Sequence, residues 1–139
     1  MFLKTIAMKK FLIALVVIFA LQSCTEEMEP STVKETKWEL KSMTGSTLPS
    51  SAKATLNFTN QSAFGGKSFC NSYGGKFSLS GNSIKFSEIF GTKMYCQEVA
   101  NAESEFLKNL ELVDELKLFN GKLKLLKKGR VMLIFTPLP

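Results

Sequence analysis

Between residues 36 and 136 the chain alternates apolar and polar side chains in short runs, a pattern typical of half-buried β-strands. In the first run, Trp38 and Leu40 point toward the predicted core, with Met43 further along. The predicted strands cover residues 36–43, 54–59, 76–79, 83–86, 114–119, 122–126 and 131–135. Because the last run, VMLIF, is almost entirely apolar, it is predicted to be a central strand buried on both faces.

Turn residues separate several of these runs. Asn120-Gly121 is the strongest hairpin signal, because both residues accept the positive φ that a two-residue turn needs. Residues 80–82 (SGN) and Lys128-Gly129 mark two further turns. Pro137 is expected to end the last strand.

One segment, residues 98–110, has a different period. Its apolar side chains recur at helical spacing, at Val99, Ala102, Phe106 and Leu110. Its acidic residues lie toward the N-terminal half, as the helix dipole favours. The predicted fold class is therefore mainly β, with seven or eight short strands in a small antiparallel barrel-like or strongly curled sheet and one α-helix at about 98–110.

The N-terminus is typical of a secretory signal. Lysines at positions 4, 9 and 10 precede an apolar run of eleven residues, 11–21. This run is too short to span about 30 Å of hydrocarbon, which takes roughly 20 helical residues. Residues 1–23 are therefore predicted to be a cleaved signal peptide.

The end of this signal resembles a bacterial lipobox. Leu21-Gln22-Ser23 leads into Cys24, which this pattern predicts to be the lipidation site. The alternative is an ordinary secreted protein with an incidental cysteine. The residue after Cys24 is Thr25 and not aspartate, which resembles the pattern of lipoproteins that are sorted to the outer membrane. The expected location is the bacterial cell envelope, with the protein anchored to the outer membrane by its lipid.

Composition limits the remaining possibilities. Residues 24–35 are polar and are predicted to be a flexible tether, followed by one domain at 36–139. The formal charge of +6 becomes +3 without the signal, which is no argument for nucleic acid. The chain has no histidine, so it cannot form a Ser-His-Asp or Cys-His site by itself. No metal or cofactor motif occurs, and neither group is expected.

Two cysteines remain after lipidation of Cys24. Cys70 and Cys96 are an even pair in an oxidising compartment, which favours a disulfide. A reactive thiol or redox pair stays open as the alternative, with Lys93 near Cys96 as a slight hint of activation.

Several motifs together resemble a known family. They are Trp38-x-Leu40, Phe69-Cys70-Asn71-x-Tyr73-x-Gly75-x-Phe77, Thr92-Lys93-Met94-x-Cys96 and Glu103-x-x-Phe106-Leu107-x-x-Leu110, followed by the Asn-Gly hairpin and the closing apolar strand. They resemble the META domain family of HslJ-like heat-shock lipoproteins, over about residues 36–136. The resemblance implies a mostly-β, barrel-like fold with one helix, roles in stress and antibiotic tolerance, and no established enzymatic activity. Where the family usually has glycine, this chain has Phe69.

Two groups of residues are candidate interaction sites. The predicted partner patch is Asn71, Tyr73, Thr92, Lys93 and Met94. The alternative is turn chemistry, in which Asn71 bonds its own backbone, Gly74 and Gly75 permit tight geometry, and Tyr73 and Met94 pack. A basic hairpin carries Lys122, Lys124, Lys127, Lys128 and Arg130. It could face anionic lipid or lipopolysaccharide, although such a strand face is more often simply solvated.

The leading functional hypothesis is a lipid-anchored, non-catalytic envelope domain. It would act as a monomer in stress or antibiotic tolerance, binding the membrane through Cys24 and an unknown envelope protein or small molecule. A lipocalin-like carrier of a small apolar ligand is the alternative. A thiol-dependent redox protein is a lesser alternative.

Overall fold

The structure, a computed structural model, describes residues 30–59 and 62–139. The predicted signal peptide and Cys24 lie outside the described residues. The elements are η1 (Pro30–Glu35), β1 (Lys37–Met43), β2 (Thr55–Phe58), β3 (Ala63–Ser68), β4 (Asn71–Ser80), β5 (Ser83–Gly91), α2 (Ala100–Leu112), β6 (Glu115–Phe119), β7 (Lys122–Lys127) and β8 (Arg130–Pro137).

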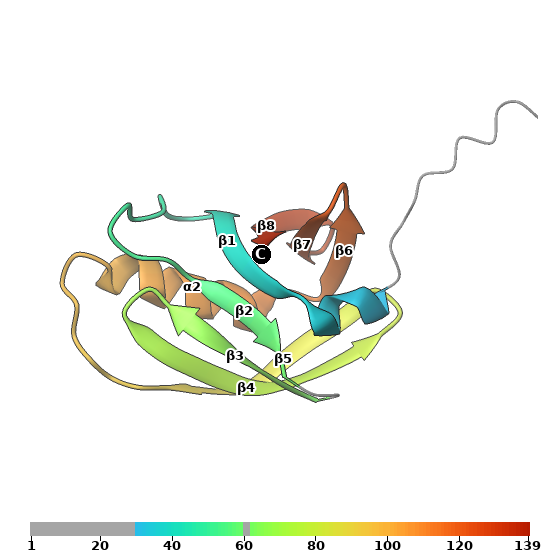
Figure 1. Ribbon diagram of the computed structural model, residues 1–139, viewed down its shortest axis with the longest axis horizontal. Coiled ribbons are helices and arrows are strands. Elements are labelled where there is room, and N and C mark those ends of the chain that lie inside the picture. Colours follow the sequence, from blue (N-terminus) through green and yellow to red (C-terminus); the bar gives the residue numbers. More distant parts are fainter. Residues whose placement is uncertain (1–29, 60–61) are drawn as a thin grey trace, which may run out of the picture.

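Eight antiparallel strands form a sheet that closes on itself, which confirms the predicted fold class. Each strand pairs with the next along the chain, and β1 completes the ring by pairing with β8. The join between β5 and β6 is the shortest, with a single registered pair, Ser83 and Glu115. In Figure 1 the curled sheet surrounds the molecule's centre, and α2 lies across it behind β1 and β2.

The interior of the ring holds one continuous apolar core. Trp38 and Leu40 of β1 point inward, and a bulge between Leu40 and Ser42 brings Met43 to the same side. The other strands contribute alternate residues, among them Leu56, Phe58, Phe77, Phe86, Leu116, Leu123, Leu125, Leu133 and Phe135. Burying one such side chain stabilises the fold by about 2 kcal/mol.

The helix α2 supplies the rest of this core. Phe106 is completely buried and its ring makes edge contacts with Tyr73 of β4 at 5.5 Å and Phe135 of β8 at 6.4 Å between centroids. The helix begins two residues later than predicted, because residues 96–99 form a turn in which the Val99 N–H donates to the Cys96 carbonyl. It ends at Leu112, two residues after the predicted end.

The two-residue turns have the predicted geometry. Asn120 and Gly121 have φ of 49° and 68°, and Lys128 and Gly129 have φ of 47° and 77°. Both central residues are therefore left-handed, which matches the natural twist of the paired strands. The turn between β4 and β5 contains Gly81 at φ 57°.

One prediction about the last strand is wrong. β8 is not buried on both faces, because only Leu133 and Phe135 are buried while Ile134 is partly exposed. A closed ring has a single interior face, so alternate residues of every strand point outward. The strand ends at Pro137, as predicted, and Pro137 pairs with Trp38 at the end of the ladder.

The sequence analysis also missed β3 and the first half of β4. Gly74 and Gly75 do permit tight geometry, but they lie within β4 and not in a turn. A Cβ atom at Gly75 would lie 2.8 Å from the Phe64 ring and 2.8 Å from the Ser87 carbonyl oxygen. At Gly66 it would lie 2.2 Å from the Thr55 carbonyl oxygen. These glycines allow neighbouring strands to approach closely.

Among the described residues no helix combines the length and the apolar character needed to cross a bilayer.

Candidate functional site: a cross-linked corner

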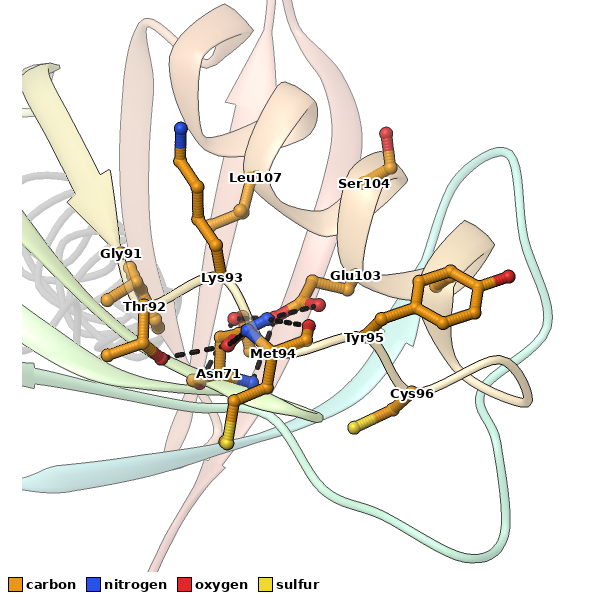
Figure 2. Close-up of a pocket in the computed structure, with 13 residues that line it drawn as sticks. Asn71, Gly91, Thr92, Lys93, Met94, Tyr95, Cys96, Glu103, Ser104 and Leu107 are labelled. Carbon is orange, nitrogen blue, oxygen red and sulfur yellow. Dashed lines mark hydrogen bonds between the residues drawn. The ribbon is translucent and has the colours of Figure 1, made fainter.

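The two family motifs around the cysteines meet at one place, which we call the corner. It consists of the β3–β4 turn (68–71), the segment 92–96 that follows β5, and Glu103 in the first turn of α2. A disulfide joins Cys70 to Cys96, with Cα atoms 6.0 Å apart and a sequence separation of 26. Figure 2 shows the residues of this corner converging on Asn71.

Asn71 holds segment 92–96 as a neighbouring strand would. Its side-chain oxygen accepts the Met94 N–H at 2.8 Å, and its amide nitrogen donates to the Met94 carbonyl at 3.1 Å. The same oxygen accepts the Thr92 hydroxyl at 2.8 Å, and the same nitrogen donates to Glu103 at 3.0 Å. All four bonding positions of the buried amide are therefore used. The interpretation that Asn71 bonds its own backbone is wrong.

Glu103 connects this arrangement to α2. Its carboxylate accepts the Asn71 N–H at 3.0 Å, the Asn71 side-chain amide, and the hydroxyl of fully buried Ser68. Sequence reasoning missed both Glu103 and Ser68 as site residues. The position of Glu103, three residues before Phe106 in the family motif, was the available signal, although an acid there also fits a simple helix-dipole explanation.

The turn residue Phe69 adopts φ 74°, a left-handed conformation that glycine takes without strain. Its side chain is buried and contacts the Phe106 ring edge-on at 6.0 Å. The chain therefore accepts a strained backbone at this turn and gains apolar packing against the helix.

The predicted partner patch divides into buried and exposed members. Tyr73 is buried, donates its hydroxyl to the Thr55 carbonyl at 2.7 Å, and its burial raises the pKa of the phenol well above its usual range. Asn71 is buried as well. Thr92, Lys93 and Met94 are on the surface. The structure brings all five residues to one place but leaves only these three accessible.

The exposed side of the corner carries large apolar side chains. Phe90, Met94 and Tyr95 are 70%, 59% and 80% exposed. Leu112 and Phe119 are the other large apolar residues exposed in the described part of the chain. In Figure 2 the side chains of Met94 and Tyr95 leave the backbone in different directions, away from the hydrogen-bonded centre. We call residues 90–95 the display segment.

Hollows flank the disulfide. A pocket of about 250 Å³ lies between the display segment and α2, lined by Lys93, Tyr95, Ser104 and Leu107 among others. A second, of about 360 Å³, lies on the other side of Cys96 beside Phe69 and residues 97–99. Lys93 and Leu107 both line the first pocket (Figure 2). No group of three or more Cys, Asp or Glu side chains in the described residues could hold a metal ion.

Comparison with known families identifies the family of this chain. The family model described as the META domain matches residues 31–138. The chain belongs to the META domain family. The resemblance drawn from the paired cysteine motifs is thus confirmed, and the corner is built from the residues of those motifs.

Solved structures show the same META fold. An NMR structure of a protein from Burkholderia xenovorans matches with a TM-score of 0.65 and 24% identity, over 78% of this chain and 85% of that chain. A second NMR structure matches with a TM-score of 0.62 and 17% identity, over 78% of this chain and 94% of that chain. Among curated proteins, none matches.

Proposed function

We propose that this META domain is a lipid-anchored, non-catalytic binding domain of the bacterial cell envelope, and that the display segment is its binding face. Cys24 would carry the lipid and hold the domain at the outer membrane as a monomer. The role would be in stress or antibiotic tolerance, as the family resemblance implies.

One observation carries the binding proposal. Three large apolar side chains within six residues are mostly exposed, on a segment that is otherwise held tightly by Asn71 and the disulfide. Large apolar side chains that are exposed at nearby positions of one segment favour an interaction site. A segment that is already rigid loses little conformational entropy on binding, which favours affinity.

The ring interior argues against a lipocalin-like carrier. Leu56, Leu123 and Phe135 are fully buried inside the ring, and Phe106 of α2 fills the space between its walls. The described pockets lie at the corner, outside this core. A thiol-dependent activity is disfavoured because Cys70 and Cys96 are joined to each other.

The anchor and the binding face need separate experiments. Cells expressing the chain would be fed an alkyne analogue of palmitate, and the label should appear on the protein but not on the Cys24→Ser variant. Equal labelling of both proteins would contradict the anchor.

The binding face is tested with a photo-crosslinking amino acid placed at Tyr95 in living cells. We expect a discrete adduct of higher mass, because the 80% exposed ring would lie in the interface. The matched control carries the crosslinker at Ser78, an exposed position on the outer face of β4. No adduct from position 95, or the same adducts from both positions, would contradict the proposal.

A further inference from the structure

The outer face of β6, β7 and β8 is strongly basic. Residues 115–137 contain six basic side chains and one acidic one, Glu115. Residues 30–139 keep a formal charge of +6, because three lysines and three glutamates precede residue 30. Much of the domain's charge is thus concentrated on one stretch of the ring.

Like charges face each other across these strands. Lys117 is directly opposite Lys124, and Lys127 is directly opposite Arg130. Such pairs destabilise an antiparallel sheet unless a counter-charge is close. Glu115 contacts Lys117 at 3.1 Å and Asp114 contacts Lys127 at 3.2 Å. Within the described residues, Lys122, Lys124, Lys128 and Arg130 have no acidic partner among the ion pairs.

Apolar side chains lie among these cations. Phe119, beside the Asn120-Gly121 turn, is 46% exposed and pairs with Lys122. The Lys124 ammonium lies 5.3 Å from the centre of the Phe119 ring. Ile134, opposite Lys124 on β8, is partly exposed on the same outer face. Cations with an aromatic ring at a hairpin tip suit a membrane interface, where the ring enters the headgroup layer and the lysines meet phosphates.

The opposite side of the ring has a different surface. The outer positions of β4 and β5 are mostly serines, with Ser78 opposite Lys85 and Ser80 opposite Ser83. Lys76 on this side is paired with Glu88 at 2.8 Å. The two sides therefore differ in charge density.

We infer that the outer face of β6–β8 docks on an anionic phospholipid surface, with Phe119 entering the headgroup layer and Lys122 and Lys124 contacting the phosphates. The chain enters the domain through η1, which lies beside β6, and Figure 1 shows η1 and the β6–β7 hairpin on the same side of the molecule. Pro30 is six positions after the proposed anchor, Cys24, a reach of about 20 Å at most. Docking through this face does not require the lipid at Cys24.

The domain without its N-terminal segment is the appropriate reagent. The whole ring and core lie in residues 30–139, and a solved relative consists of this fold over 94% of its length. Sedimentation with vesicles of phosphatidylcholine, with or without about 30% phosphatidylglycerol, measures partitioning at about 0.1 M salt. We expect at least about tenfold stronger partitioning onto the anionic vesicles.

Matched variants locate the docking face. Lys122→Gln/Lys124→Gln should weaken partitioning about 25-fold, since each lysine near an anionic surface contributes about fivefold. Lys76→Gln/Lys85→Gln removes the same charge from the serine-rich side and should change partitioning less than about threefold. Phe119→Ser, which leaves the charge unchanged, should also weaken it. Thermal unfolding confirms that each variant is folded.

Three results would overturn the inference. The first is equal partitioning onto both kinds of vesicle. The second is an equal loss in the two double variants, which would mean that only net charge matters. The third is displacement by duplex DNA at equal phosphate concentration, which would indicate a general polyanion site. Failure of palmitate labelling at Cys24 would leave these results unaffected, so the two proposals are tested separately.

Discussion

The corner and the basic hairpin use polar residues in opposite ways. In the corner, every bonding position of the Asn71 amide has a partner, and Glu103 collects three donors without any cation among them. On the hairpin, Lys124 faces Lys117, and its ammonium lies over the Phe119 ring. The first arrangement pairs its polar groups within the fold, whereas the second leaves Lys124 without an acidic partner among the ion pairs of the described residues. Cations left without a partner are most often found at functional surfaces, so the hairpin is where we expect the anionic lipid surface to dock.

Removing the disulfide should have the largest effect on the stability of the corner. Cys70→Ala/Cys96→Ala should lower the free energy of unfolding by about 3.5 kcal/mol, because a cross-link over 26 residues restricts the unfolded chain. Denaturant unfolding of the variant and of the reduced wild-type domain measures the loss. A loss below about 1 kcal/mol in both would show that the hydrogen bonds alone hold the corner.

Asn71→Ala should cost about 2–3 kcal/mol, since it leaves the buried partners of a fully used amide without hydrogen bonds. A fall in the melting temperature of about 10 °C or more is expected for a domain of this size. The control is Asn82→Ala, at the exposed β4–β5 turn, which should change stability by less than about 0.5 kcal/mol. Similar losses in both variants would show that Asn71 contributes no more to stability than an exposed asparagine does.

Phe69→Gly separates the two effects combined at the β3–β4 turn. Glycine relieves about 1 kcal/mol of left-handed strain, but removing the buried ring costs about 3 kcal/mol. We expect a net loss of about 2 kcal/mol in chemical denaturation. A variant as stable as the wild type would mean that packing of Phe69 on Phe106 contributes little.

A substitution in the basic hairpin should change stability only slightly, and it should raise stability where the substitutions in the corner lower it. Lys124→Glu replaces a like-charge pair with an attractive one opposite Lys117, so stability should rise by about 0.5 kcal/mol. Vesicle partitioning should fall in the same variant. A decrease in stability would show that the contact of Lys124 with Phe119 outweighs the repulsion.

The sequence predicted the C-terminal half of the ring better than the N-terminal half. β6 and β7 alternate cleanly around Asn120-Gly121, and that turn has the expected positive φ angles. The glycine-rich β3 and early β4 gave no such pattern, because Gly66 and Gly75 are required by contacts with strands distant in sequence. A register shift between Gly74 and Lys76, opposite Glu88 at φ 51°, also interrupts the alternation.

The candidate site was predicted only in outline. The cysteine motifs placed Asn71, Thr92 and Met94 in one predicted patch. Which of these residues are buried depends on the hydrogen bond from the Met94 N–H to the Asn71 side chain, 23 residues away in sequence. Glu103 was visible as a helical acid, yet its role depends on where α2 lies against the β3–β4 turn. Such roles follow from tertiary contacts that no local pattern specifies.

The central claim is that Asn71 fixes the display segment, and amide hydrogen exchange at Met94 tests it most directly. Met94 lies outside any strand and its side chain is 59% exposed, yet its N–H donates to the Asn71 oxygen at 2.8 Å. The account predicts slow exchange in the wild-type domain, and fast exchange at Met94 in Asn71→Ala while the β7 and β8 amides stay protected. Exchange at the unprotected rate in the wild type would contradict it.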